Sequence, residues 1–476
     1  MKAGQPDEQQ CVPTTNVMNW HNSIKVALPL AIVSVCLFGC VLDYQSDVFR
    51  ELHAALLLVQ WMLLVCLAVW CSSFIFLTFG RRDLPLIGLL LIAIAMYFIS
   101  YTASAPAADA IILLAGVTLG KAARFFVGDE VTSLISKSKN EKWETRNKLE
   151  TPYVVSYFLF GNVILLAFSA WWHLDIAGTY HGPRSMGLWD NPNIYGMLMG
   201  AGVTLAIGLF VENRRRRGDE SHFEKQKVEC GKRQVVRVSS RCPLPIILFI
   251  AAGMMAVGLF FSYSRGAWVG TVIGLLYLAW SYGKLKWRYV IIGAGLVALG
   301  VVLFWGHTAD NAPWYLKRLD LSRPSAQHRV SAWRGAFQMM RDHPFGVGWN
   351  KAVETYDRNY SPPEGGAAAL TMNSYLMVGT ELALPGLICF VAYVWLSFCG
   401  RARHSVRASA MEVSGAQGAT RPIVQTVCRA GALVLVVAFW FDGGLFDLPT
   451  ASVFWILLEL GSVSTHISPI DFTGRS

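Results

Sequence analysis

Three arginines, Arg184, Arg265 and Arg329, lie in segments that join long apolar runs rather than inside those runs. A guanidinium group stays charged at physiological pH and can bind a phosphate through two parallel hydrogen bonds. In the stretch LFFSYSRGAWVGTV (259–272), Arg265 stands between two runs that are each long enough to cross a membrane. A charge in the middle of a bilayer is costly, so Arg265 must face something polar. Brought together, such residues would bind a pyrophosphate group.

The composition indicates a membrane protein. The chain has 476 residues, of which 54% are hydrophobic and 15% charged, and its mean hydropathy is +0.41. Soluble domains are usually about a quarter charged. Continuous apolar blocks of about 20 residues predict membrane helices, whereas a membrane barrel would show short alternating segments. The net charge of +10 lies mainly in loops, as the positive-inside rule expects, so we predict membrane lipids and no nucleic acid as partners.

We predict an all-α, polytopic integral membrane protein with about twelve transmembrane helices and one long, partly helical periplasmic loop. The predicted spans are 24–42, 54–77, 84–103, 107–127, 152–173, 192–211, 244–263, 267–283, 288–306, 373–398, 430–446 and 450–464. This divides the chain into four parts: 1–183 with five helices and an outer loop, 184–306 with four helices, the periplasmic loop 307–372, and 373–476 with three helices.

The basic connections predict the orientation. The segment GRRDLP and residues 128–151, 212–243, 283–288 and 399–429 all fall on the same side as both termini when twelve spans are counted. Both termini are therefore expected inside. The outward connections are then 43–53, 104–106, 174–191, 262–266, 307–372 and 447–449. Arg184, Arg265 and Arg329 all belong to this outward set.

The outward loop 307–372 contains a predicted amphipathic helix. Residues 325–341 repeat apolar side chains at helical spacing, with Ser325 as the expected N-cap. Arg329 falls within the apolar stripe and Arg334 near its edge. The stripe consists of Val330, Trp333, Phe337 and Met340. A loop far longer than about 15 residues is usually functional or disordered, and the tryptophans in and beside this one argue against disorder.

Four segments resemble the O-antigen ligase and polymerase (Wzy_C-type) family of bacterial envelope glycosyltransferases. They are RSMGLWDNPNIYG (184–196), SRGAW (264–268), RVSAWRGAFQMMRDHPFGVGW (329–349) and MNSYLMVGTELALPG (372–386), in this order along the chain. The resemblance extends from about residue 184 to 396. The first four spans match the family only in hydropathy.

The resemblance implies a metal-independent and cofactor-free transferase of lipopolysaccharide or other polysaccharide biosynthesis. Such an enzyme moves a glycan from an undecaprenyl-pyrophosphate carrier to a lipid, glycan or protein acceptor at the periplasmic face of the bacterial inner membrane. Carried over by position, Arg184, Arg265 and Arg329 become candidates for binding the pyrophosphate, with Arg265 and Arg329 as catalytic residues. Further candidate substrate-binding residues are Asn191, Asn193, Arg334 and Asn373.

The last segment departs from the family pattern. The family has a His-Asn pair where this chain has Met372 and Asn373. That histidine would be the natural general base for the acceptor hydroxyl, and methionine cannot replace it. His343, His328, Glu354 or Glu381 are possible substitutes. We select His343 and Glu381 as catalytic candidates, although a carboxylate about two turns into a membrane span also suits helix packing.

Three other functions remain open. The chain could be a polysaccharide polymerase of the same family, a multispanning transporter or flippase, or a non-catalytic relative. A transporter should hold its site near the middle of the membrane and often contains an internal repeat. We find no such repeat, and only Arg124, Glu381 and Glu459 suggest a site within the membrane.

Overall fold

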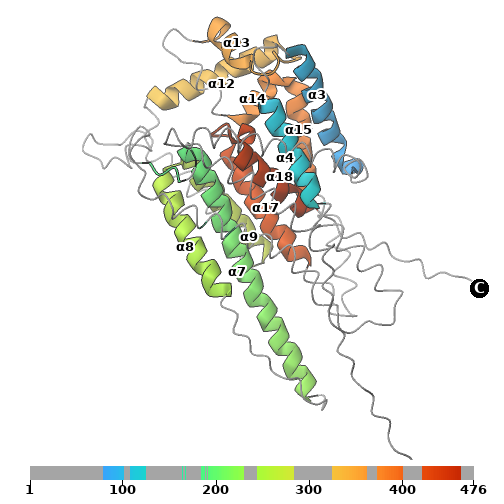
Figure 1. Ribbon diagram of the computed structural model, residues 1–476, viewed down its shortest axis with the longest axis vertical. Coiled ribbons are helices and arrows are strands. Elements are labelled where there is room, and N and C mark those ends of the chain that lie inside the picture. Colours follow the sequence, from blue (N-terminus) through green and yellow to red (C-terminus); the bar gives the residue numbers. More distant parts are fainter. Residues whose placement is uncertain are drawn as a thin grey trace, which may run out of the picture.

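The computed structural model describes residues 79–100, 108–124, 163, 167, 184–187, 189, 191–229, 244–283, 324–361, 373–399 and 421–462. Every regular element within these ranges is a helix, as predicted (Figure 1). Apart from residues 163 and 167, the predicted spans 24–42, 54–77, 152–173 and 288–306 lie outside the described residues. The total of twelve membrane helices therefore stays a prediction.

The described helices follow most of the predicted apolar runs. They are η1 (Arg81–Asp83), α3 (Leu84–Ser100), α4 (Ala108–Ala123), α7 (Pro192–Glu229), α8 (Leu244–Ser262), α9 (Arg265–Ser281), α12 (Pro324–Asp342), α13 (Ala352–Asn359), α14 (Ser374–Glu381), α15 (Ala383–Cys399), α17 (Arg421–Ala438), η4 (Gly444–Phe446) and α18 (Leu448–Ser462). Residues 192–214 of α7 and 245–262 of α8 are long and apolar enough to cross a membrane. Shorter apolar stretches lie in α3, α15, α17 and α18.

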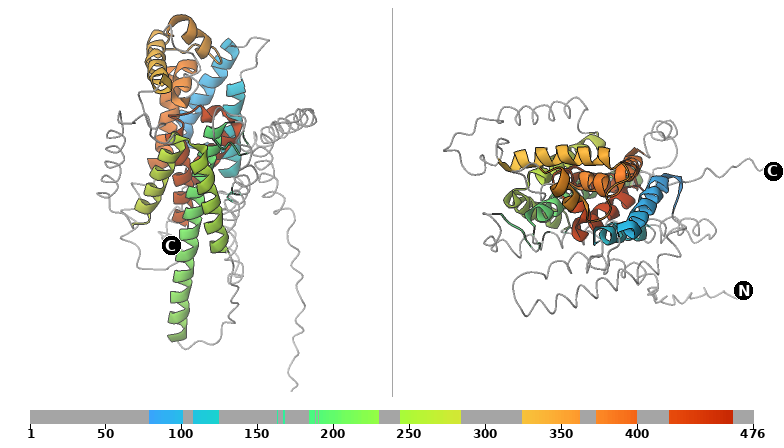
Figure 2. Two further views of the ribbon diagram at one scale, coloured as in Figure 1. Left: turned by 90° about the vertical axis from the view of Figure 1, so that its left-hand side faces the viewer. Right: turned by 90° about the horizontal axis from the view of Figure 1, so that it is seen from above.

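The apolar helices form a bundle whose one end carries α12. Seen from above, α12 lies lengthwise across the view while the long helices are seen closer to end-on (Figure 2). We call this the α12 end. The described parts of the predicted outward connections 174–191 and 262–266 lie there, where the N–H of Ser185 donates to the carbonyl oxygen of Phe261. Gly266 packs against Phe441, in the turn that follows α17. The predicted inward segment GRRDLP lies at the opposite end, where Arg82 donates to the carbonyl oxygen of Ser462. Which end faces the periplasm stays a prediction.

The centre of the bundle is α18. Each of its residues is buried, and it packs against α4 and α17, while α17 also contacts α7 and α9. A helix that is apolar on all sides fits such a central place. The helices α8 and α15 instead expose large apolar side chains, such as Phe249 and Trp395. In a membrane these surfaces would contact lipid.

Small residues let α9 approach α17 closely. Gly266, Gly270 and Gly274 recur every four residues on one face of α9. A Cβ atom on Gly270 would collide with the carbonyl oxygen of Val434, and one on Gly266 would lie 2.6 Å from Cβ of Phe441. Glycine at such spacing is a common device for close contact between membrane helices. This contact fixes the start of α9, and therefore Arg265, against the residues that follow α17.

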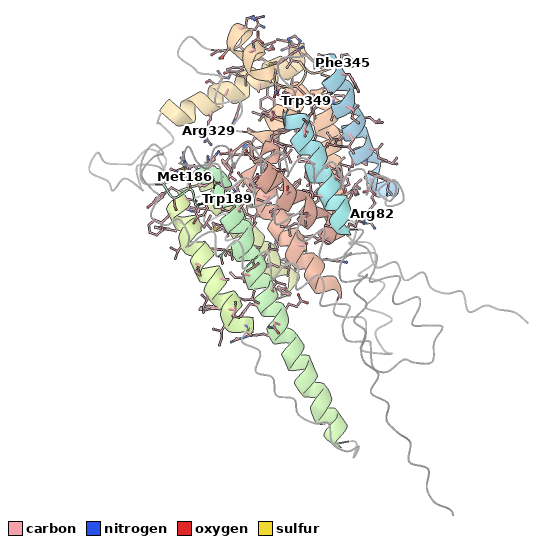
Figure 3. All side chains as sticks on the ribbon, in the orientation of Figure 1. Arg82, Met186, Trp189, Arg329, Phe345 and Trp349 are labelled. Atoms are coloured by element: carbon pink, nitrogen blue, oxygen red, sulfur yellow. The ribbon has the colours of Figure 1, made fainter. Side chains whose placement is uncertain are left out.

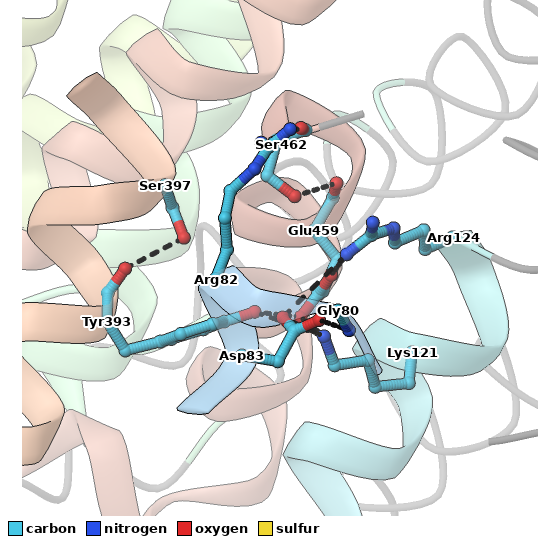
Figure 4. Close-up of polar contacts among 9 residues, drawn as sticks. All are labelled: Gly80, Arg82, Asp83, Lys121, Arg124, Tyr393, Ser397, Glu459 and Ser462. Carbon is cyan, nitrogen blue, oxygen red and sulfur yellow. Dashed lines mark hydrogen bonds and ion pairs between the residues drawn. The ribbon is translucent and has the colours of Figure 1, made fainter. Parts of the chain in front are cut away.

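A buried network of charged side chains holds the opposite end together (Figure 4). Nζ of Lys121 on α4 lies 2.7 Å from Oδ1 of Asp83 and 2.8 Å from Oε1 of Glu459. Arg124 lies 3.2 Å from the other oxygen of Glu459, and the Tyr393 hydroxyl donates to the same carboxylate. Arg124 and Glu459, which suggested a site within the membrane, are thus partners in a network that joins η1, α4, α15 and α18.

Two predicted spans differ from the observed helices. The span 430–446 is wrong in position, because α17 covers 421–438 and is followed by a turn and η4. The apolar residues Phe439, Trp440 and Phe441 extended the hydropathy signal beyond the true end of the helix. The span 373–398 is broken into α14 and α15 at Leu382, next to Ala383, which has a positive φ of 70°.

The amphipathic helix in the long loop is confirmed, with two corrections. It begins at Pro324, so Ser325 is a helical residue and not the N-cap. Its buried face is also different from the predicted stripe, since Val330 and Phe337 are exposed. Small side chains allow α12 to lie close to α13 and α14, where longer ones would hold it away. The buried hydrophobic residues of this face are Ala332, Ala336, Met339 and Met340.

Candidate functional site

Arg184 joins two connections at the α12 end. Its Nε donates to the carbonyl oxygen of Ser262 at 2.9 Å, and its Nη2 donates to Oδ1 of Asn193 at 2.6 Å. Ser262 ends α8, whereas Asn193 lies in the first turn of α7. The backbone N–H of Ser185 adds a bond of 2.9 Å to the carbonyl oxygen of Phe261. The segment before α7 is therefore fixed against the turn between α8 and α9.

The Asn-Pro-Asn motif builds the start of α7. Oδ1 of Asn191 accepts from the backbone N–H of Asn193 at 2.8 Å, as an N-cap side chain does, and Pro192 occupies the first helical position. Asn193 then holds Arg184. The sequence predicts both asparagines as substrate-binding residues. In the structure, Asn191 starts the helix and Asn193 positions Arg184.

Arg329 approaches the turn after α17. Its Nη1 donates to the carbonyl oxygen of Phe441 at 3.2 Å, and the guanidinium attracts the carboxylate of Asp442. Burial lowers the pKa of Arg329, and Asp442 opposes this effect. A guanidinium still keeps its charge at physiological pH. Arg329 lies at the same end of the bundle as Met186 and Trp189, which follow Arg184 closely in the chain (Figure 3).

Asp442 is a residue of this site that the sequence reasoning missed. It is 8% exposed, and its Oδ1 accepts from the backbone N–H of Gly443 at 2.8 Å. The side chain of Asn193 donates to its carboxylate, and both Arg329 and Arg184 attract it. Burial raises the pKa of Asp442 above its ordinary value, against the effect of these neighbours. Two arginines from separate connections thus lie near enough to attract one carboxylate.

The signal for Asp442 was present in the sequence. Asp442 is followed by two glycines, a combination typical of turns. The predicted span 430–446 instead placed Asp442 inside a membrane helix, because the apolar residues before it raised the local hydropathy. The observed turn 439–443 lies outside both neighbouring helices.

Arg265 begins α9 beside the same turn. Its side chain is half-buried, and the next residue, Gly266, packs against Phe441. Phe441 is the residue whose carbonyl oxygen binds Arg329. The N-terminus of a helix also favours anions, because its first N–H groups point outward. Arg184, Arg265 and Arg329 therefore all belong to segments that approach residues 439–443. We call the three arginines, Asn193 and the turn 439–443 the arginine site.

Asn373 is buried beneath this turn. Its Oδ1 caps α14 by accepting from the backbone N–H groups of Tyr375 and Leu376, and its Nδ2 donates to the carbonyl oxygen of Trp440 at 3.0 Å. Next to it, Oγ of Ser374 donates to the carbonyl oxygen of Asp442 at 2.9 Å. Asn373 has no exposed surface. Its position supports the turn rather than a contact with substrate.

Arg334 and His343 are exposed and point to no common site with Arg329. Five residues at 100° each place Arg334 about 140° around the helix from Arg329. His343 follows the end of α12, about 20 Å along the helix from Arg329 at about 1.5 Å per residue. Neither prediction gains support from this arrangement.

Glu381 lies at the break between α14 and α15. It is 2% exposed, and among the described residues its Oε2 has no hydrogen-bond partner. Its carboxylate lies near Asp109 and accepts from the backbone of Asn350. The third motif contacts this break. The N–H of Gly348 donates to the carbonyl oxygen of Glu381 at 3.2 Å. Glu381 is about 10 Å along α14 from Ser374, away from the arginine site.

The predicted base position cannot be compared, because Met372 lies outside the described residues. Among those that are described, no three His, Cys, Asp or Glu side chains form a group that could hold a metal ion.

The described helices and the arginine site define an all-helical protein with membrane-length apolar helices and a cationic site at one end. Residues 250–391 match the family model described as O-antigen ligase, which confirms the predicted resemblance over this segment. The matching segment includes Arg265 and Arg329 and excludes Arg184 and Asp442. No curated protein shows a significant match to the chain. The match supports glycosyl transfer of the ligase or polymerase type.

Proposed function

We propose that this protein is a glycosyltransferase that moves a glycan from an undecaprenyl-pyrophosphate carrier to an acceptor at the periplasmic face of the bacterial inner membrane. The observation that carries the proposal is the approach of Arg184 and Arg329 to the turn that contains Asp442. Arg184 donates to Asn193, whose side chain binds the Asp442 carboxylate, and Arg329 donates to the carbonyl oxygen of Phe441. The two arginines come from connections that are more than a hundred residues apart. Two guanidinium groups held beside one turn supply the charge and the hydrogen-bond donors that a phosphate needs.

The leaving group explains the need for arginine. The acceptor oxygen attacks C1 of the sugar, the bond from C1 to the pyrophosphate oxygen breaks, and the electron pair remains on the pyrophosphate. Guanidinium groups fixed before the reaction stabilise this developing negative charge. We assign this task to Arg184, Arg265 and Arg329, and direct attack from the opposite face of the sugar would invert the configuration at C1.

Asp442 and Asn193 are proposed as positioning residues. Asn193 accepts from Arg184, and Asp442 interacts with Asn193 and attracts both arginines. We assign both to holding the guanidinium groups and not to accepting a proton from the acceptor. Prearranged donors need no reorganisation during the reaction.

The general base is tested by restoring the family histidine. His343 and Glu381 both lie away from the arginine site, and Met372 offers no basic atom. A Met372→His variant that alone creates transfer would identify the natural chain as a degenerate relative. If wild type is active and Met372→His transfers glycan at the same rate, another group accepts the proton.

The acceptor distinguishes the ligase from the polymerase. Both use the same donor and the same leaving group, so the arginine site serves either reaction. We favour ligase-type transfer to a lipid acceptor, with polymerisation of the glycan as the alternative. Transport receives less support, since the charged groups Arg124 and Glu459 bind each other in the network at the opposite end.

The test is glycan release and transfer from an undecaprenyl-pyrophosphate-linked donor by the purified full-length chain. We expect Arg329→Ala to lower the rate by about a hundredfold or more, the scale of losing one donor to a developing anion. The matched control is Arg341→Ala, an exposed arginine on the same helix. If wild type and Arg329→Ala release glycan equally, the assigned chemistry is wrong.

A further inference from the structure

Two tryptophans stand beside the arginine site. The rings of Trp333 and Trp440 meet edge to face, with centroids 5.6 Å apart. Trp440 is 39% exposed and Trp333 is half-buried. We call them the tryptophan pair. They come from α12 and from the turn after α17, the same two elements that bring Arg329 and Asp442 together.

The ring of Trp440 is held by α14. Tyr375 contacts it at a centroid distance of 5.7 Å, and the hydroxyl of Tyr375 donates to the carbonyl oxygen of Val436 at 2.6 Å. Nδ2 of Asn373 binds the backbone carbonyl of Trp440 itself. A tryptophan that served only to anchor the protein at the membrane surface would not need these partners. The pair is therefore held in place by α14 and α12, and both rings remain partly exposed.

The tryptophan pair is adjacent to Arg329, which the proposed function assigns to phosphate binding. Trp333 follows Arg329 by four residues, so the two side chains are neighbours on one face of α12. Trp440 directly precedes Phe441, whose carbonyl oxygen binds Arg329. The Cα atoms of adjacent residues are about 3.8 Å apart. A group attached directly to a phosphate at Arg329 would therefore reach this surface.

We propose that the tryptophan pair binds the first sugar ring of the donor, the ring whose C1 carries the pyrophosphate. This inference rests on the proposed function and adds the residues that recognise the sugar. A pyranose has one face made largely of C–H groups, and large rigid aromatic rings supply a matching apolar surface. Arg329 and the tryptophan pair would then fix the two sides of the bond that breaks.

Two measurements test the proposal, with N-acetylglucosamine 1-phosphate as the soluble probe. In saturation-transfer NMR on the detergent-solubilised chain, we expect signal transfer to the C–H protons of the sugar. The transfer should fall about threefold or more in Trp440→Leu, which keeps an apolar side chain but loses the ring, and persist in Trp440→Phe. For the lipid-linked donor, Trp440→Leu should raise KM about fivefold with little change in kcat.

Trp395→Leu is the matched control. Trp395 is 66% exposed on α15, in a surface of the bundle that faces outward, and has no place in the site. If both leucine variants lose binding equally, the effect is general to exposed tryptophans and the proposal is wrong. It is also wrong if Trp440→Leu behaves as wild type while Arg329→Ala loses the probe. In that case the proposed function would stand, whereas a wild type that binds the sugar but never releases glycan would contradict the proposed function alone.

Discussion

The guanidinium of Arg329 and the carboxylate of Asp442 attract each other across the junction between α12 and the turn that follows α17. The two residues belong to different parts of the chain, and both are largely buried. Arg184 approaches the same carboxylate from a third segment, through Asn193. Asp442 is thus an anionic side chain close enough to two arginines to attract both.

Protonation of Asp442 should strengthen the binding of a diphosphate. Burial raises the pKa of Asp442, and a bound anion would raise it further, so binding takes up a proton. Protonation removes the charge that competes for Arg184 and Arg329. We expect Asp442→Asn to bind inorganic pyrophosphate about tenfold more tightly near neutral pH, a change of about 1.4 kcal/mol. Isothermal titration calorimetry at several pH values measures both effects.

Pyrophosphate also gains protons as the pH falls, which weakens its attraction to arginine, and both proteins share that contribution. The ratio of the two dissociation constants therefore isolates Asp442. The advantage of Asp442→Asn over wild type should shrink as the pH falls, and a ratio that stays constant would contradict the role assigned to this carboxylate.

Asn193 should act through Arg184. Because Oδ1 of Asn193 accepts from Nη2 of Arg184 at 2.6 Å, Asn193→Ala should raise KM for the donor several-fold. The same substitution should add little in an Arg184→Ala background, since residues in one hydrogen-bonded network couple by about 0.5–3 kcal/mol. Steady-state kinetics of the two single variants and the double variant measure the coupling. Fully additive effects would show that Asn193 acts independently.

The close contact between α9 and α17 should be sensitive to one methyl group. Gly270→Ala places a Cβ against the carbonyl oxygen of Val434, and such overpacking costs about 1–3 kcal/mol. Gly253→Ala on α8 is the control, because a Cβ there meets open space. Thermal unfolding in detergent should show a lower Tm for Gly270→Ala and an unchanged Tm for Gly253→Ala. Equal behaviour would mean that the two helices are not closely packed.

The network at the opposite end should contribute to stability and not to donor binding. Lys121→Met removes the fully buried cation between Asp83 and Glu459 and leaves only Arg124 beside them, and breaking a buried pair costs about 3–5 kcal/mol. Arg358→Ala removes an exposed pair with Glu354 and should change stability by less than about 1 kcal/mol. Denaturation together with the KM for donor tests this distinction. A Lys121→Met protein of normal stability but altered KM would point to a functional role.

Much of the fold could be read from local patterns. The predicted spans 84–103 and 244–263 correspond to α3 and α8, and the helix predicted at 325–341 is α12. Apolar run length and helical spacing are properties of short segments, so they are visible in a single sequence. The same patterns assigned the three arginines to connections between the apolar runs. The structure brings these connections to one end of the bundle.

The sequence by itself predicted the helices, the arginines as candidate anion ligands and a sidedness that stays a prediction. Only the tertiary structure decided that Arg184 and Arg329 approach the turn of Asp442, that Asn373 supports this turn, and that His343 and Glu381 lie elsewhere. Helix formation depends on neighbours within a few residues, whereas these contacts join segments far apart in the chain. Their geometry follows from how closely helices such as α9 and α17 pack, which no local pattern specifies.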